Sequence, residues 1–290
     1  MRHFGIIAGA LSIALCIFSA CGNKYEFNLD ERIGLCGGVG KDSIMVANGL
    51  AYIEASVSGF LDPEASEEEF EANRKYAAEA KLPILAANGF FPREIKVVGP
   101  DADLDRAVKY SETAIRRASE IGIKTLVLGS SRSRNVPEGF DHEEGRAQFV
   151  NLLKAIAPYA EKSGITIVIE PLQKEESNLI NTVREGTAIC KEVNSPAICV
   201  LADFFHMARM KEDAGAIVEA GKYLKHCHIA ECESRTAPGV KGDDFTSYFQ
   251  ALKDIKYEGL ISFECGWQNN QEELLPAAMK VMKEQIAAVK

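Results

Sequence analysis

The sequence lacks the features that several broad classes of protein require. The formal net charge is -9, and no run of lysine or arginine forms a basic patch. Most of the surface would therefore repel a nucleic-acid backbone, and no nucleic-acid partner is expected. Apart from Cys16 and Cys21 near the start, six cysteines are scattered or lie inside apolar runs, as Cys199 does in "AICVLAD". This pattern indicates no disulfide framework, although the sequence allows a single disulfide between Cys190 and Cys199.

Linkers and nucleotide-binding loops are also missing. No low-complexity tract or change of composition divides the chain after residue 30, which predicts one domain over residues 31–290. The glycines of "GGVGKDS" match neither the dinucleotide fingerprint nor the phosphate-loop pattern, and are more typical of a turn. With 47% hydrophobic residues, the chain has enough apolar material for one large core.

The first 20 residues have the composition of an export signal. Arg2 precedes an uncharged apolar stretch from Phe4 to Ala20. The run "FSAC" resembles a bacterial lipobox, which predicts a lipoprotein-type signal peptide over residues 1–20, a lipid anchor at Cys21 and a tether over residues 21–30. Phe18 stands where leucine is usual, so simple signal cleavage and an uncleaved anchor remain alternatives. We expect an exported, periplasmic or cell-envelope lipoprotein whose only membrane contact is this anchor.

Eight short apolar runs alternate with amphipathic segments along the rest of the chain. Residues 66–81 begin with a capping-box pattern at Ser66 and Glu69, and residues 104–122 end at Gly122; both segments are predicted helices. Nearly continuous apolar strands separated by helices indicate a parallel sheet covered on both faces. Eight such units fit a closed (β/α)8 TIM barrel, with a doubly wound open sheet as the alternative. The predicted strands lie within residues 32–38, 50–56, 82–88, 124–130, 165–171, 197–203, 224–230 and 260–265.

Each of the last four predicted strands carries a potential metal ligand at or near its end: Glu170, Asp203, His228 and Glu264. In a barrel, these ends meet at the mouth that holds the active site. Three crowded carboxylates would repel one another and take up protons unless a cation lay among them. One nitrogen and three oxygens suit Mn²⁺, Mg²⁺ or Co²⁺ and do not exclude Zn²⁺.

Two histidines lie on one face of the seventh strand, in "KHCHIA". Because alternate residues of a strand share a face, His226 and His228 are predicted to point into the barrel and Cys227 toward the helices. His228, nearer the strand end, is the predicted ligand. His226 lies one layer deeper, where we expect a hydrogen-bonded core histidine that supports the site from below.

These motifs resemble those of the xylose isomerase-like barrel superfamily, in its sugar phosphate isomerase/epimerase branch that includes the ketose 3-epimerases. The resemblance rests on "IEPL" followed by "EESN", then "ADFFHM", "HCHIAE" and "ISFEC". It implies that Glu170, Asp203, His228 and Glu264 hold one divalent ion, with Mn²⁺ the leading candidate. It also implies that Glu170 and Glu264 transfer protons on opposite faces of a sugar.

The same resemblance implies three residues that contact substrate. His206 matches a substrate-contacting histidine, Arg235 an arginine that reaches substrate oxygens, and Glu176 a carboxylate that binds a sugar hydroxyl. A surface histidine and a solvated ion pair are the alternatives for these positions. Trp267, the single tryptophan, is expected either to stack on a sugar face or to cover the barrel rim as a hydrophobic lid.

The resulting functional hypothesis is a metal-dependent isomerase or epimerase that acts on a ketose or related keto sugar through an enediolate. Predicted export favours an alternative, a lyase acting on 3-keto glycosides with the same metal site. A non-catalytic, secreted sugar-binding lipoprotein is a further alternative. The sequence decides neither whether the substrate is phosphorylated nor whether the protein is a homo-oligomer. A DNA repair nuclease of the endonuclease IV type would need more histidines than the five present, and a basic surface.

Overall fold

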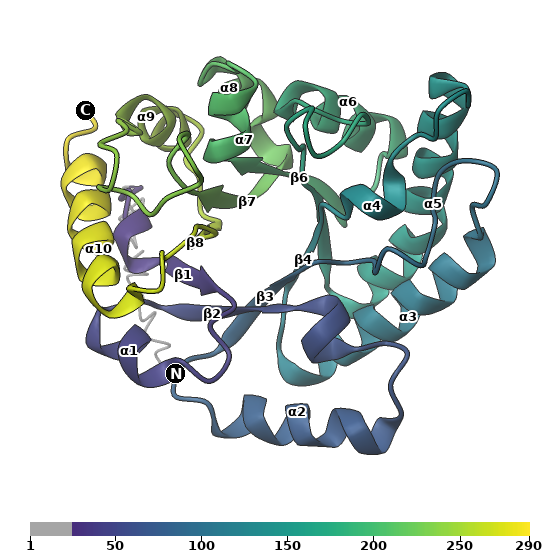
Figure 1. The fold of residues 1–290 in the computed structure, drawn as a ribbon, viewed down its shortest axis with the longest axis horizontal. Coiled ribbons are helices and arrows are strands. Elements are labelled where there is room, and N and C mark those ends of the chain that lie inside the picture. The colour runs from purple at the N-terminus through teal and green to yellow at the C-terminus, as the bar shows by residue number, and fades with distance from the viewer. Residues whose placement is uncertain (1–24) are drawn as a thin grey trace, which may run out of the picture.

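The computed structural model describes residues 25–290, which form a closed barrel of eight parallel strands surrounded by helices (Figure 1). Each strand pairs with the next along the chain, and β1 closes the barrel by pairing with β8. The predicted TIM barrel is confirmed. The predicted signal peptide and Cys21 lie outside the described residues. The strands are β1 (Ile33–Cys36), β2 (Tyr52–Ser56), β3 (Ile84–Asn88), β4 (Thr125–Leu128), β5 (Thr166–Ile169), β6 (Ile198–Asp203), β7 (Leu224–Ile229) and β8 (Leu260–Phe263).

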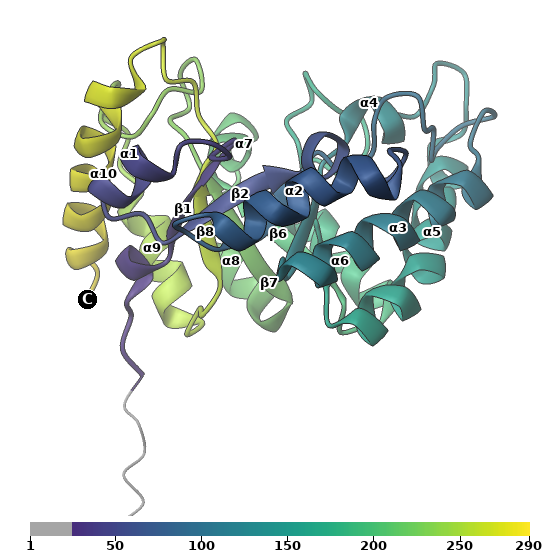
Figure 2. The same ribbon diagram turned by 90° about the horizontal axis from the view of Figure 1, so that it is seen from below.

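The helices pack around the outside of the barrel and leave the ends of the strands open (Figures 1 and 2). The capping box predicted at Ser66 is present, since its hydroxyl accepts from the Glu69 amide while the Glu69 carboxylate accepts from the Ser66 amide. The helix over residues 104–121 ends at Gly122, as predicted, and Gly122 adopts the left-handed conformation. The helices are α1 (Asp42–Ala47), α2 (Glu67–Glu79), α3 (Leu104–Ile121), α4 (Ser131–Arg134), α5 (His142–Ser163), α6 (Val183–Val193), α7 (Phe204–Arg209), α8 (Gly215–Ala220), α9 (Thr246–Asp254) and α10 (Gln271–Ala287).

Strand alternation separates an outer core from the barrel interior. The outer-facing residues belong to one large hydrophobic core with the helices, and Cys227 is among them, as predicted. The inner-facing residues of β4, β5 and β6 form a small apolar cluster of their own: Val127, Val168, Cys199 and Leu201. In β2, β7 and β8, by contrast, polar side chains fill buried inner positions: Tyr52, Glu54, His226, His228 and Ser262. The interior is therefore apolar on one side and polar on the other.

Some residues of the segment predicted to be a tether pack against the barrel. Leu29–Glu31 form a short 3-10 helix, and Leu29 is fully buried in the core. The hydroxyl of Tyr25 donates to the carbonyl of Tyr257 over 3.2 Å. The reason is that Leu29 supplies apolar surface that the base of the barrel can bury.

Two further observations concern residues 25–290 as a whole. Within residues 25–290, no helix has both the length and the apolar composition needed to cross a membrane. All six cysteines of this part of the chain are free thiols, Cys190 and Cys199 included.

Candidate metal centre and active site

The structure brings the four predicted metal ligands together at the mouth of the barrel. Asp203 is the last residue of β6, His228 lies in β7, and Glu170 and Glu264 directly follow β5 and β8. One donor atom from each lies within 4.8 Å of all the others. Nδ1 of His228 is 3.1 Å from Oε1 of Glu170 and 3.2 Å from Oε2 of Glu264.

Burial and mutual repulsion disturb the titration of these carboxyls. Burial, followed by the charge of Glu264, raises the pKa of Glu170. Burial also raises the pKa of Asp203 to about 6, although Arg235 opposes the shift. At Glu264, burial acts in the same direction, but His228 and Arg235 together outweigh it and lower the pKa to about 2. A divalent cation among these oxygens would neutralise the repulsion, so the donor set fits a metal ion.

Glu54 on β2 orients the histidine ligand and is absent from the sequence-based site. Its carboxylate is fully buried, with Oε2 2.8 Å from Nε2 of His226 and Oε1 2.9 Å from Nε2 of His228. Burial raises the pKa of Glu54, but the two histidines lower it well below its ordinary value. An ionised carboxylate can only accept, so Nε2 of His228 donates to Glu54. The Nδ1 atom is then the ring nitrogen that faces Glu170 and Glu264 and that would bind an ion.

A buried network extends from Glu54 into the barrel. The Ser262 hydroxyl donates to Glu54 over 2.5 Å, and the Tyr52 hydroxyl lies 2.5 Å from that of Ser262. His226, bonded to the same carboxylate, has the supporting position expected for it. A sequence signal for Glu54 did exist, because it is a charged residue inside the apolar strand "AYIEAS".

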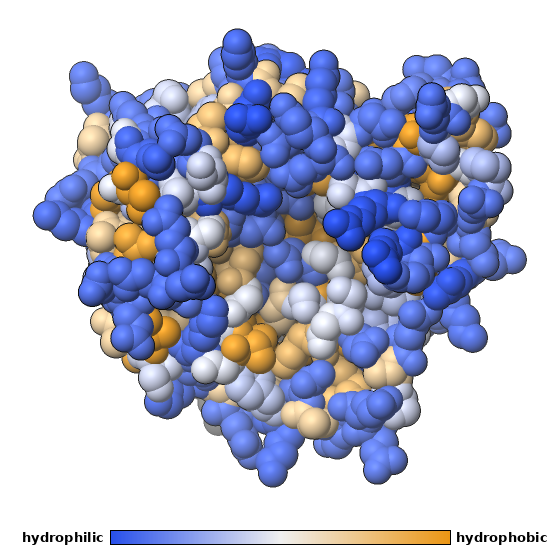
Figure 3. Space-filling model, viewed as in Figure 1, coloured by the Kyte–Doolittle hydropathy of each residue, from blue (hydrophilic) through white to orange (hydrophobic). Residues whose placement is uncertain are grey.

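A cavity of about 320 Å³ opens above the four predicted ligands, and both hydrophilic and hydrophobic residues lie around the centre of the face seen in Figure 3. His206, Arg235 and Glu176 line this metal-site cavity, where sequence reasoning predicted them to contact substrate. Asn88 also lines it and donates to Oε1 of Glu264 over 2.9 Å.

His206 offers a hydrogen-bond donor to this cavity. Its Nδ1 accepts from the backbone amide of Gln173 over 3.1 Å, which leaves the hydrogen on Nε2. Burial lowers the pKa of His206, so the ring is neutral. Within residues 25–290, its buried Nε2 makes no hydrogen bond, although Oδ2 of Asp203 lies 3.5 Å away, and a substrate oxygen would satisfy it.

Arg235 lies over the metal site and balances its negative charge. Its guanidinium is 3.2 Å from Oδ2 of Asp203, contacts Oε2 of Glu264, and is 3.8 Å from Oε1 of Glu176. The side chain is 29% exposed and packs over the ring of Phe205 at 4.8 Å. Arg235 is therefore part of the site and not a solvated surface ion pair.

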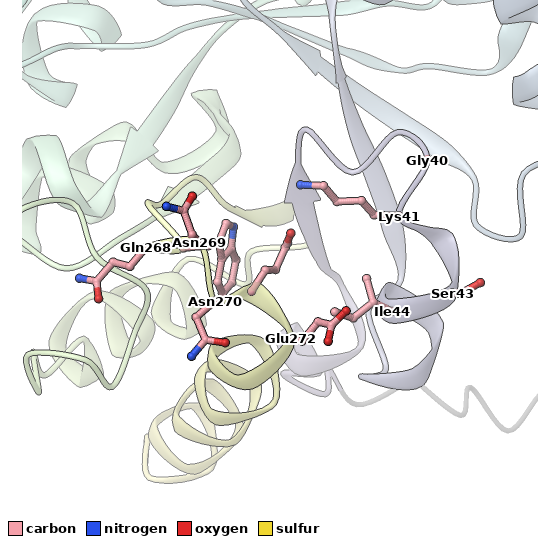
Figure 4. A pocket seen from close by; sticks show the side chains of 10 residues that line it. Gly40, Lys41, Ser43, Ile44, Gln268, Asn269, Asn270 and Glu272 are labelled. Carbon is pink, nitrogen blue, oxygen red and sulfur yellow. The ribbon is translucent and has the colours of Figure 1, made fainter.

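Trp267 is not brought to the metal-site cavity. Its ring packs edge-on against Phe263, with 5.8 Å between ring centroids, at the rim of the barrel. It lines a second cavity of about 780 Å³ between the loops that follow β1 and β8 (Figure 4). The half-buried ring thus covers the rim on one side and faces this second cavity on the other.

Residues 43–285 match the family model of the xylose isomerase-like TIM barrel. The chain belongs to this family. An L-ribulose 3-epimerase of Methylomonas sp. is 29% identical to the chain over 260 residues, which are 81% of this chain and 87% of the relative. A 3-dehydro-D-guloside 4-epimerase of Escherichia coli is 24% identical, over 73% of this chain and 83% of the relative.

A solved structure shares the fold of this xylose isomerase-like barrel. It is the D-psicose 3-epimerase of Clostridium cellulolyticum H10 with D-tagatose, which superposes with a TM-score of 0.77 at 21% identity. The superposition covers 89% of this chain and 99% of that one. The predicted family is confirmed, and its named relatives are sugar epimerases.

Proposed function

We propose that this protein is a divalent-metal-dependent epimerase of keto sugars. The proposal depends on one observation: Glu170 and Glu264 follow non-adjacent strands, yet their carboxylates approach the same imidazole nitrogen of His228. Two carboxylates that meet from different sides of the mouth can reach both faces of one sugar carbon. The names of the relatives support epimerisation of a keto sugar.

Glu170, Asp203, His228 and Glu264 would hold a divalent ion, whose Lewis acidity would make the C–H bond next to the ketone more acidic. One glutamate accepts the proton from that carbon, and the other returns a proton to the opposite face, which inverts the centre. His206 donates through Nε2 to a substrate oxygen, and Arg235 stabilises negative charge as the enediolate forms.

The test is turnover in deuterated water. With Mn²⁺ and a ketohexose, we expect solvent deuterium at the single inverted carbon of the product. Glu170→Gln and Glu264→Gln should each lower kcat/KM by about 100-fold or more, because each removes a proton-transfer group. Glu175→Gln is the matched control, since Glu175 is exposed and its ion pair within residues 25–290 is with Arg209. An inverted product without solvent label would contradict the proposal.

A lyase acting on 3-keto glycosides is a second candidate, favoured by predicted export and by the keto glycoside in the name of the Escherichia coli relative. Removal of the C2 proton from a 3-keto glycoside, followed by departure of the glycosidic oxygen from C1, would release the alcohol. A p-nitrophenyl 3-ketoglucoside separates the two outcomes. Released p-nitrophenolate indicates the lyase, and inversion with the glycosidic bond intact indicates the epimerase.

We also propose that the protein is exported and acylated at Cys21, on the sequence pattern described above. Labelled palmitate supplied to a bacterial expression host should be incorporated into the wild-type chain but not into Cys21→Ala. Cys16→Ala is the control and should be labelled as strongly as the wild type. An unlabelled wild-type chain would contradict acylation.

A further inference from the structure

The second cavity, which we call the rim cavity, is the larger of the two at the barrel mouth. It lies between the loop that joins β1 to α1 and the loop that joins β8 to α10. In Figure 4, Lys41 extends from the first loop toward the second, which carries Gln268 and Asn269. Its volume of about 780 Å³ falls in the range of ligand-binding cavities.

The rim cavity is adjacent to the metal-site cavity. β1 and β8 are paired neighbours, so the loops that follow them lie side by side. Glu264 lines the metal-site cavity, and Trp267, three residues later, lines the rim cavity. Their Cα atoms are therefore at most about 10 Å apart. A backbone hydrogen bond of 2.7 Å from Gly266 to Arg235 fixes the segment between them.

The lining of the rim cavity suits hydroxyl groups. Four of the residues that line it carry side-chain amides, and an amide can both donate and accept, as a sugar hydroxyl does. The amide of Asn270 donates to Glu273 over 2.6 Å, and the side chain of Gln268 extends away from the β1–α1 loop in Figure 4. The Nε2 atom of Gln271 is buried, and within residues 25–290 it has no hydrogen-bond partner. Trp267 adds a half-buried aromatic ring, which can pack against the apolar face of a sugar. The four amides belong to Gln268, Asn269, Asn270 and Gln271.

The charges in the cavity favour a neutral ligand over an anion. Lys41 and Glu272 contribute one charge of each sign. Within the described residues, no carboxylate lies within ion-pair distance of the Lys41 amine, so its donors are available to a ligand. Glu272 and Glu273 occupy the first turn of α10, where they offset the positive end of the helix dipole and would repel an anion.

We infer that the rim cavity binds a second, uncharged sugar unit, joined through a glycosidic bond to the keto sugar at the metal centre. This inference builds on the proposed function and narrows its substrate class to glycosides larger than one sugar. Trp267 and the amides would contact the distal sugar, and Lys41 would donate to its hydroxyls.

Trp267 reports directly on this cavity because it is the only tryptophan in the chain. We would titrate the Mn²⁺-loaded protein with sucrose, trehalose, maltose and cellobiose, and with glucose, while following tryptophan fluorescence. At least one disaccharide should produce a saturable change at a concentration tenfold or more below that needed for glucose. Lys41→Met should weaken this response, and Lys75→Met on exposed α2 should not. No saturable response to any disaccharide would overturn the inference.

Kinetics then separate this inference from the proposed function. Lys41→Met should raise KM for the 3-keto form of the disaccharide that binds by about tenfold, because the variant loses one hydrogen bond to a charged group. It should leave kcat/KM for a free ketohexose unchanged. Equal effects on both substrates would refute the role of the rim cavity while epimerisation stands. Failure to turn over any keto sugar would refute the proposed function, and the fluorescence titration would still decide the binding site.

Discussion

At the scale of single residues, the candidate metal centre depends on the Glu54 carboxylate, which contacts the predicted ligand His228. Glu54 fixes which imidazole nitrogen faces the other carboxylates, and it holds His226 in the layer below. Such supporting contacts set the orientation and basicity of a metal-bound histidine. Glu54 is a positioning residue, since it acts on the site through His228.

Glu54→Gln tests this role. The amide can no longer accept from both histidines, so we expect the affinity for Mn²⁺ to fall about 10- to 100-fold, measured by calorimetric titration. Activity should recover in part at saturating Mn²⁺, because the four ligands remain. Glu64→Gln, which removes an exposed carboxylate paired with Arg106, is the control. Unchanged metal affinity in Glu54→Gln would contradict the orienting role.

Gly129, which follows β4, provides a second test at the residue scale. A Cβ atom at this position would overlap Oε2 of Glu170 and lie 3.3 Å from its carboxyl carbon. Gly129→Ala should therefore displace this carboxylate and lower kcat/KM about 100-fold, as misplacement by about 1 Å can do. Thermal unfolding should change little, because the carboxylate is the flexible end of a side chain. A large fall in Tm with activity retained per folded molecule would refute this explanation.

At the scale of elements, the loop between β7 and α9 is built around one buried carboxylate. Glu231 accepts from the Thr236 hydroxyl at 2.7 Å and from the backbone amides of Gly239, Lys241 and Gly242 at 2.6 to 2.8 Å. Arg235 lies in this loop with a left-handed backbone conformation (φ 51°). The folded loop is thus what holds the guanidinium over Asp203 and Glu264.

The pH dependence of this loop follows from the pKa of Glu231. Burial raises this pKa, but Thr236 and the loop amides outweigh burial and lower it below its ordinary value. A depressed folded-state pKa stabilises the fold above the unfolded-state pKa of about 4.3, and this stability is lost as the pH falls through the folded-state value. Glu231→Gln should cost about 1–3 kcal/mol in free energy of unfolding at neutral pH.

Chemical denaturation at several pH values measures this difference. The gap between wild type and Glu231→Gln should be largest near neutral pH and shrink below about pH 4. KM for substrate should also rise, because Arg235 loses its support. Glu233→Gln, in the same loop but paired with Lys241 at the surface, should show neither effect. A stability gap that stays constant with pH would mean that the charge of Glu231 is unimportant.

At the scale of the whole molecule, the barrel interior combines an apolar half and a polar half. The inner residues of β4 to β6 supply an apolar cluster, and β2, β7 and β8 supply the buried polar network under the metal site. Closure of β1 onto β8 brings these strands together. Binding of a metal to the folded state alone should therefore stabilise the entire domain.

Calorimetry can measure that coupling. At a free metal concentration 100 times the Kd, the added stability is about 2.7 kcal/mol, which should raise Tm by about 5–10 °C. Chelation should reverse the shift, and Asp203→Asn should reduce it. A Tm that responds to none of Mn²⁺, Mg²⁺, Co²⁺ and Zn²⁺ would exclude the proposed metal centre.

Local patterns in the sequence determined much of this arrangement. The period of two in "KHCHIA" assigned His226 and His228 to the interior, and the capping box at Ser66 marked the start of α2. The ends of β5 to β8 predicted that the four candidate ligands meet at one place, as they do, because parallel strands in a closed barrel must finish at the same mouth. These features follow from backbone geometry within a few residues.

Contacts between distant parts of the chain were decided only by the tertiary structure. Glu54 meets His226 and His228 across 172 and 174 residues of sequence, and no local period encodes such a pairing. Trp267 follows β8, the strand that precedes Glu264, yet its ring lines the rim cavity. The reason is that, after a strand ends, the packing of the loop sets the direction of each side chain. Leu29 joins the core for a similar reason, since the surface that buries it exists only once the barrel closes.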